Sequence, residues 1–228
     1  MPYNRDKEDK FLVTVDCVLF GFEQETLKVL LTCKNQEEQR TWSLAGGFLK
    51  KNETLDGAAS RVLYHLTGKQ DIFMEQLYAL SCTDRHPMQG TVAVAYVALI
   101  NIENIDKELI LENHAQWHSL SEVPPLVFDH NAILKKAIQR LQRRIRTKPV
   151  AFELLPEKFS FRRLQKLYEA ILNRTLDKRN FVSKIKSLDI LIKLNEKDMG
   201  SSTKKSYLYK FKQWKYFDKN ESDFYLKF

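Results

Sequence analysis

The sequence has few cysteines, and they form no recognisable pattern. Cys17, Cys33 and Cys82 are odd in number and widely spaced, and the chain contains no CxxC pair. This spacing indicates neither a disulfide framework nor a zinc site. We expect the three residues to serve as small side chains of the core.

Long apolar runs are also absent. The longest, TVAVAYVALI at residues 91–100, is too short to cross a bilayer and is rich in the β-branched residues of a buried strand. The charged start, MPYNRDKEDKFL, lacks the apolar stretch of a secretion signal. We therefore expect a cytoplasmic protein. No internal repeat is evident.

Acidic and basic residues are unevenly distributed. Residues 1–130 hold 12 Lys and Arg against 19 Asp and Glu, a net charge of −7, whereas residues 131–228 hold 25 against 10, a net charge of +15. The strongly basic part predicts a partner with a phosphate backbone, although a solvated lysine-rich surface would give the same count. With 43% hydrophobic residues, the composition is that of a globular protein rather than a disordered one.

The acidic part alternates between strand and helix patterns. The stretch FLVTVDCVLFGFEQETLKVLLTCK predicts a hairpin that turns at Glu23 to Glu25. Residues 54–67 predict an amphipathic helix closed by Gly68, and a strand follows at 91–101, then a shorter one around AQWHSL. The apolar side of the helix consists of Leu55, Ala58, Ala59, Val62, Leu63 and Leu66.

A second helix, DHNAILKKAIQRLQRRIR, begins with Asp129 as its N-cap and carries a strongly basic outer face. Its apolar face consists of Ile133, Leu134, Ala137, Ile138 and Leu141. Pro149 and Pro156 then interrupt the pattern, so we predict a mixed α/β domain at 1–148 and a second domain at 149–228. The second domain reads as helix, turn, helix and two strands joined by KDMGSSTKKS.

The stretch GGFLKKNETLDGAASRVLYHLTG resembles the Nudix hydrolase box, GX5EX7REUXEEXGU, in which U is aliphatic. The matching positions are Gly47, Glu53, Arg61, Leu63 and Gly68. The places of the three later glutamates hold Val62, His65 and Leu66, and the final aliphatic place holds Lys69.

These substitutions argue against catalysis. In the Nudix family the helix glutamates hold magnesium, which requires oxygen ligands, against a diphosphate. Valine and leucine supply no ligand, a single imidazole prefers softer metals, and Glu53 alone does not replace the cluster. We predict no catalytic residues, no metal, no cofactor and no pyrophosphohydrolase activity. Glu53 and Arg61 are expected to pair and brace the loop against the helix, and His65 to be an ordinary exposed residue.

A Nudix-like fold keeps its cleft without the metal ligands, so a small-molecule site is still expected. The candidate ligand-binding residues are Trp42, Asp84, Arg85 and His86, although a stretch such as TDRHP is more often a plain loop than a site. His114 and His118 lie four residues apart, but their strand-like context and the lack of a third ligand argue against a metal site.

The basic part contains two helices suited to a DNA-binding unit. The first places Phe161, Leu164, Leu167, Tyr168 and Ile171 on one apolar face. Asp177 caps the second, whose Phe181, Ile185 and Leu188 face the core. The predicted DNA-binding residues are Lys178, Arg179, Asn180, Ser183, Lys184, Lys186 and Ser187 on the second helix, with Lys204 and Lys205 on a basic wing. A solvated lysine-rich hairpin is the plainer alternative.

The degenerate box followed by LQKLYEAI and LDKRNF resembles the Nudix-related transcriptional regulators. The resemblance implies an α/β Nudix-like sandwich with a C-terminal winged helix-turn-helix domain, and a homodimer on a partly palindromic DNA operator. It also implies a small-molecule effector, either an ADP-ribose-like compound or a pentose such as L-arabinose. The missing glutamates slightly favour a sugar.

Two other functions stay open from the sequence. One is a Nudix-type pyrophosphohydrolase acting on a nucleoside diphosphate derivative, which would need a compensating carboxylate cluster that the sequence does not display. The other is a general nucleic-acid binder with a purely structural Nudix domain. Binding that is sensitive to salt but not to sequence would favour this second alternative.

Overall fold

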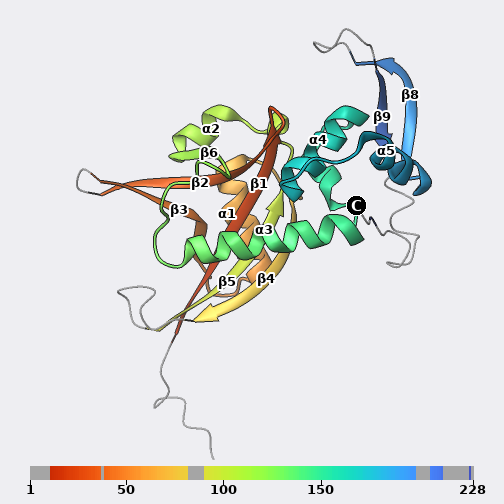
Figure 1. The fold of residues 1–228 in the computed structure, drawn as a ribbon. Helices are drawn as coiled ribbons and strands as arrows, with labels where there is room; N and C mark the ends of the chain where they lie inside the picture. The colour runs from red at the N-terminus through yellow and green to blue at the C-terminus, as the bar shows by residue number, and fades with distance from the viewer. Residues whose placement is uncertain (1–10, 37–38, 82–89, 199–205, 213–225, 227–228) are drawn as a thin grey trace, which may run out of the picture.

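The computed structural model describes residues 11–36, 39–81, 90–198, 206–212 and 226 (Figure 1). Six strands build a large sheet: β1 (Leu12–Glu23), β2 (Thr26–Gln36), β3 (Gln39–Phe48), β4 (Phe73–Ser81), β5 (Thr91–Leu99) and β6 (Ala115–Ser119). Their order is β4-β5-β1-β3-β2-β6. β1 runs parallel to β5, and the other pairings are antiparallel.

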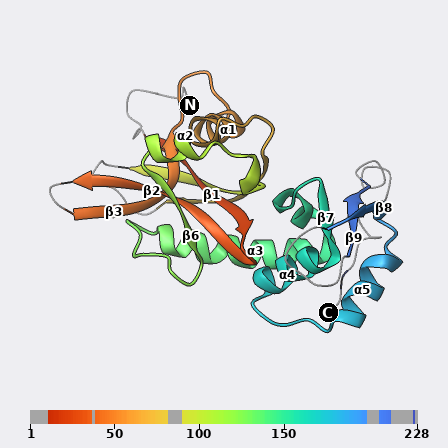
Figure 2. The ribbon, with the colours of Figure 1, turned by 90° about the horizontal axis from the view of Figure 1, so that it is seen from above.

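Helices cover both faces of this sheet. On one face lie α1 (Leu55–Thr67) and the short α2 (Lys107–Glu112), which follows the 3-10 turn η2 (Ile102–Asn104); on the other lies α3 (His130–Thr147) (Figure 2). Alternate residues of β1 supply the two cores. Val15, Cys17 and Leu19 belong to the core under α1, and Val18, Phe20 and Phe22 to the core under α3.

The predicted elements of this part are confirmed within a few residues. The hairpin turns at Gln24 and Glu25, both with positive φ, and the first helix spans Leu55–Thr67. Asp129 precedes α3 but makes no side-chain capping hydrogen bond. Strands β3 and β4 were not anticipated. No helix in the described residues combines the length and apolar character needed to cross a membrane.

A second, smaller sheet belongs to the winged helix. Its elements are η3 (Val150–Leu154), β7 (Lys158–Ser160), α4 (Phe161–Leu172), α5 (Lys178–Ser187), β8 (Leu191–Lys197) and β9 (Tyr207–Phe211). The strand order is β7-β9-β8. The expected succession of two helices and two strands is confirmed. The three-residue β7 was missed, because so short a strand shows no alternation.

One apolar core runs from the large sheet into the winged helix. The cluster under α3 continues through η3 into α4 and α5. Two ion pairs join the same parts: Arg162 to Glu25 at 3.2 Å and Arg163 to Glu103 at 2.6 Å. Figure 1 shows α3 running from the sheet to below α4. The predicted domain boundary after residue 148 therefore lies between α3 and η3, which pack in the same core. Its exact position stays a prediction.

Of the two cysteines that the structure describes, Cys17 takes the expected place in the core. Cys17 is fully buried in β1, and burial raises the pKa of its thiol. Cys33 is half-buried in β2. Cys82 lies outside the described residues.

Candidate ligand-binding and DNA-binding sites

The helix of the Nudix-like motif, α1, is fixed at both ends by local hydrogen bonds. At its start, the Thr54 hydroxyl accepts a hydrogen bond from the Gly57 N–H at 3.0 Å. At its end, Gly68 adopts the left-handed conformation with φ of 66°, and its N–H donates to the Tyr64 carbonyl at 2.7 Å. Glycine adopts this conformation without strain, so it suits the end of the helix.

The Glu53 carboxylate is occupied by neighbouring protein groups. Arg61 donates to both of its oxygens, Nε to Oε1 at 2.7 Å and Nη2 to Oε2 at 2.9 Å, and the Lys50 N–H donates to Oε2 at 3.0 Å. Arg61 first, and then Lys50, lower the pKa of Glu53 to about 2. Arg61 Nη2 also donates to the Phe48 carbonyl at 3.0 Å. The predicted brace between loop and helix is confirmed.

The positions that hold the later glutamates of the Nudix box carry no carboxylate here. Val62 and Leu66 are only 7% and 5% exposed and belong to the core, whereas His65 is exposed. Asp56, on the same helix, accepts a hydrogen bond from the Tyr96 hydroxyl at 2.6 Å. In the part of the chain that the structure describes, no three His, Cys, Asp or Glu side chains gather to hold a metal ion. These residues do not fit the magnesium site of the Nudix box.

Trp42 lies on the opposite face of the sheet from α1. Its side chain packs against the core under α3, and its ring meets the His118 ring edge-on at a centroid distance of 4.5 Å. The structure thus separates this candidate from the Nudix-like helix, and its role in ligand binding stays a prediction. The other three candidates, Asp84, Arg85 and His86, lie outside the described residues.

The two nearby histidines do not form a helical metal-binding pair. His118 belongs to strand β6, whereas His114 precedes that strand in a left-handed conformation. Burial lowers the pKa of His118. The strand-like context inferred for this stretch is confirmed for His118, whereas His114 lies in the turn before the strand.

Two polar side chains of α4 hold the turn between α4 and α5. Gln165 Nε2 donates to the Leu176 carbonyl at 2.9 Å, and Glu169 Oε1 accepts from the Leu176 N–H at the same distance. Asn173 ends α4 in the left-handed conformation with φ of 51°. Gln165 and Glu169 belong to the motif LQKLYEAI, whose apolar residues the sequence places on the core side of the helix; the role of its two polar residues in holding the turn was not anticipated.

Helix α5 is anchored as predicted. The Asp177 carboxylate accepts a hydrogen bond from the Asn180 N–H at 2.8 Å. Phe181 and Ile185 are fully buried, and the Phe181 ring meets Tyr168 edge-on at 5.4 Å. Because Phe181 and Ile185 hold one face of α5 against the core, the opposite face of the helix must point to solvent.

The outer side of α5 presents cations to solvent. The exposed residues are Lys178, Arg179, Asn180, Ser183, Lys186 and Ser187, and Lys184 is half-buried. Among the described residues, no carboxylate pairs with Lys178, Arg179 or Lys186. The Ser187 hydroxyl donates to the Lys184 carbonyl at 2.8 Å, so its proton is used within the helix. Unpaired cations on a rigid helix are suited to phosphate and base-edge contacts.

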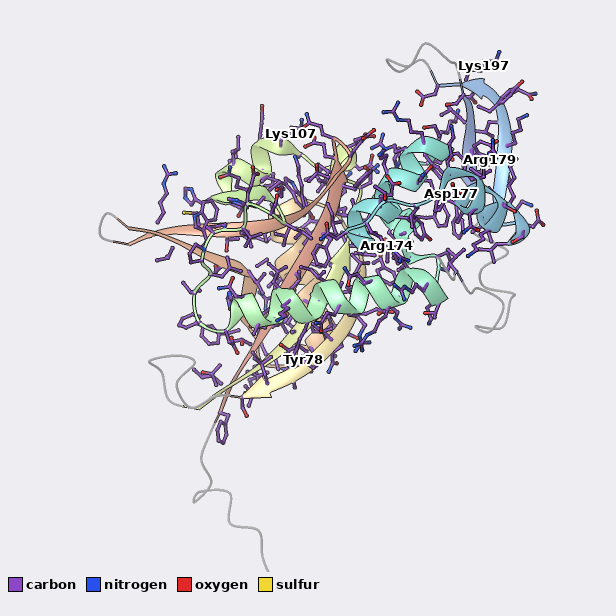
Figure 3. All side chains as sticks on the ribbon, in the orientation of Figure 1. Tyr78, Lys107, Arg174, Asp177, Arg179 and Lys197 are labelled. Atoms are coloured by element: carbon purple, nitrogen blue, oxygen red, sulfur yellow. The ribbon has the colours of Figure 1, made fainter. Side chains whose placement is uncertain are left out.

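Strands β8 and β9 form the hairpin predicted as a wing. The Lys193 ammonium lies 3.6 Å from the centroid of the Tyr207 ring, a contact that ties the two strands together. Figure 3 shows Lys197 at the outer end of this hairpin. The tip with Lys204 and Lys205 lies outside the described residues.

Two family models match the chain, one over the part with the large sheet and one over the part with the small sheet. A NUDIX domain model matches residues 10–141, and a model of the NrtR DNA-binding winged helix domain matches residues 151–211. Together with the observed sheets and helices, these matches confirm the expected α/β Nudix-like sandwich with a C-terminal winged helix.

Individual relatives share this arrangement. The ADPR responsive transcriptional repressor NtrR of Acinetobacter baylyi is 32% identical over 184 residues, which cover 78% of this chain and 74% of the relative. Shewanella oneidensis NrtR in complex with a 27mer DNA is 28% identical, with a TM-score of 0.78 over 87% of this chain and 93% of that one. The NUDIX domain of the same NrtR, complexed with ADP ribose, is 30% identical, with a TM-score of 0.50 over 61% of this chain and 94% of that domain.

Proposed function

The chain belongs to the Nudix-related transcriptional regulators, and from this membership we propose that it is a repressor that responds to ADP-ribose or a closely related nucleoside diphosphate sugar. The effector is inferred from the A. baylyi repressor, which is ADPR responsive, and from the S. oneidensis NUDIX domain complexed with ADP ribose. Neither relative supports the pentose that the missing glutamates had favoured.

The outer face of α5 is the observation that carries the DNA-binding proposal. Arg179 and Asn180 lie at its first turn, where their side chains would contact guanine and adenine edges in the major groove. The flanking lysines would neutralise phosphates. Two copies of the chain would each place α5 on one half of a partly palindromic operator.

Fluorescence anisotropy with a duplex selected by the full chain from a random library tests this role. We expect Arg179→Ala and Asn180→Ala each to weaken binding about tenfold at fixed salt, with relaxed preference at one base position. Lys107→Ala is a matched control, because Lys107 lies on α2, away from Arg179 (Figure 3). If the variants lose the same affinity for the selected and the random duplexes, α5 contacts phosphates and does not read the base sequence.

We further propose that the Nudix domain binds its effector without hydrolysing it. Support comes from the buried Val62 and Leu66, which replace metal ligands, and from Glu53, which Arg61 holds through both oxygens. A carboxylate engaged in this way is poorly placed to coordinate a cation. The chain would have two arrangements that differ in their affinity for the operator. The effector would bind one arrangement more tightly than the other and so change operator affinity.

The effector and hydrolysis proposals are tested on the same sample. ADP-ribose at 100 times its dissociation constant should raise the melting temperature, since ligand binding there adds about 2.7 kcal/mol to the folded state. The compound should be recovered intact after incubation with magnesium. Turnover that disappears in Glu53→Gln would instead identify a working pyrophosphohydrolase.

A further inference from the structure

A cleft of about 380 Å³ lies between the large sheet and the winged helix. One wall comes from residues 69–73, which lead from the end of α1 into β4, and from Leu99, Ile100, Asn101 and Asn104 at the end of β5 and just after it. The other wall comes from the stretch around η3, from β7 and from β9; its residues include Phe152, Glu153, Glu157, Phe159, Lys210 and Phe211. A volume of this size accommodates a small organic molecule. The 13-residue α1 separates Lys69 from the Glu53 end of the motif by roughly 20 Å, so this cleft is distinct from the loop that Glu53 braces.

The winged-helix wall of the cleft presents aromatic rings. Phe152 and Phe211 stack with their centroids 4.3 Å apart and an angle of 12° between their planes, and Phe159 lies 5.6 Å from Phe152. Leu99 contributes from the large sheet. Such a surface suits a flat apolar ring.

Two polar groups of the cleft lack partners within the described residues. Glu153 forms no ion pair there, and although its side chain reaches solvent, the surrounding protein raises the pKa of its carboxyl through desolvation. Asn101 is 95% buried; its Oδ1 accepts a hydrogen bond from the Glu103 N–H at 3.2 Å, but its Nδ2 has no partner. Of the two, only Glu153 reaches solvent, so its carboxylate is the group that a ligand in the cleft can contact and pair with.

The remaining charges favour a cationic ligand. Lys210 is already paired with Glu157 at the rim. Of the lining residues without an ion pair among the described residues, Asp71 and Glu153 are negative and Lys69 is positive, which leaves a net negative charge. A cation would pair with a carboxylate here, whereas an anion would meet two of them.

We propose that this cleft binds a small aromatic cation, with its ring on the phenylalanine wall and its positive group on Glu153. This site goes beyond the proposed effector function, because it uses none of the loop around Glu53 and requires no DNA. A ligand held by both walls also stabilises the packing of the winged helix against the large sheet.

Benzamidine and its neutral counterpart benzamide test the assignment, since the two have the same size and differ in charge. Titration calorimetry on the full chain should give a millimolar dissociation constant for benzamidine, as expected for nine non-hydrogen atoms. Benzamide should bind at least about fivefold more weakly, because it lacks the charge-assisted pair with a partly exposed carboxylate. Glu153→Gln should abolish this preference. Glu112→Gln, which removes an exposed carboxylate from α2, should retain it.

Unliganded melting temperatures check that both variants fold like the parent protein. Equal binding of the two probes, a preference that survives Glu153→Gln, or no binding by either probe would each overturn the assignment. Loss of preference in Glu153→Gln alone would support it. Because the titration contains neither DNA nor ADP-ribose, its outcome is independent of whether the proposed regulatory function holds.

Discussion

Helices α1 and α5 are built alike but leave different groups available. Each begins at a side-chain cap, Thr54 for α1 and Asp177 for α5, and each packs an apolar side against a core. Beside α1, the Glu53 carboxylate is held by Arg61. On α5, Arg179 is exposed and has no carboxylate partner among the described residues. The Glu53 carboxylate therefore serves the structure of its own loop, whereas the Arg179 guanidinium stays available to a partner.

Removing the core anchor of each helix should produce the largest effects. Phe181 and Leu63 are 0% and 1% exposed and lie in different apolar clusters. We expect Phe181→Ala to cost about 3–5 kcal/mol and Leu63→Ala about 2–5 kcal/mol of unfolding free energy, measured by urea denaturation. Only Phe181→Ala should abolish operator binding under conditions in which the protein stays folded. Equal losses of DNA binding would show that the two helices are not separate units.

Removing the N-cap side chain of each helix should reduce the unfolding free energy less than removing its core anchor. Asp177→Ala and Thr54→Ala each delete one acceptor for a backbone N–H, and each should cost about 1 kcal/mol in thermal unfolding. Asp177→Ala should also weaken operator binding, because the cap fixes the first turn of α5, where Arg179 and Asn180 lie. Operator affinity unchanged in Asp177→Ala but reduced in Thr54→Ala would reverse the assigned roles.

Local patterns account for what the sequence predicted well. The apolar periodicity of α1, α3, α4 and α5 gave their extents, because each helix buries one face. The Asp177 cap and the pairing of Glu53 with Arg61 connect residues three and eight positions apart. Such contacts are set mainly by one turn or one loop, so residue spacing was enough to anticipate them.

The missed features depend on distant parts of the chain. Strand β3 contains Gly46 and Gly47, and glycine weakens the pattern of a strand. A Cβ at Gly46 would lie 2.7 Å from the Asp16 carboxylate on the neighbouring strand, so the contact that favours glycine comes from a distant part of the chain. The pair of Arg163 with Glu103 joins residues 60 positions apart. The cleft between the two parts draws on several separate segments. None of these carries a local periodic signal.

The smallest expected effect concerns the Glu53 carboxylate, which lies just before α1 and pairs with Arg61. Glu53 has a folded pKa of about 2, against about 4.3 for an unfolded glutamate. The unfolded chain therefore binds the proton more readily, and the contribution of the pair to stability is complete above about pH 5 and fades between about pH 4.5 and pH 2. The melting temperatures of the parent protein and Glu53→Gln should accordingly differ at neutral pH and converge in acid. If the difference between the two melting temperatures stays constant across this pH range, the effect of the substitution comes from packing. The charge of Glu53 would then not stabilise its loop.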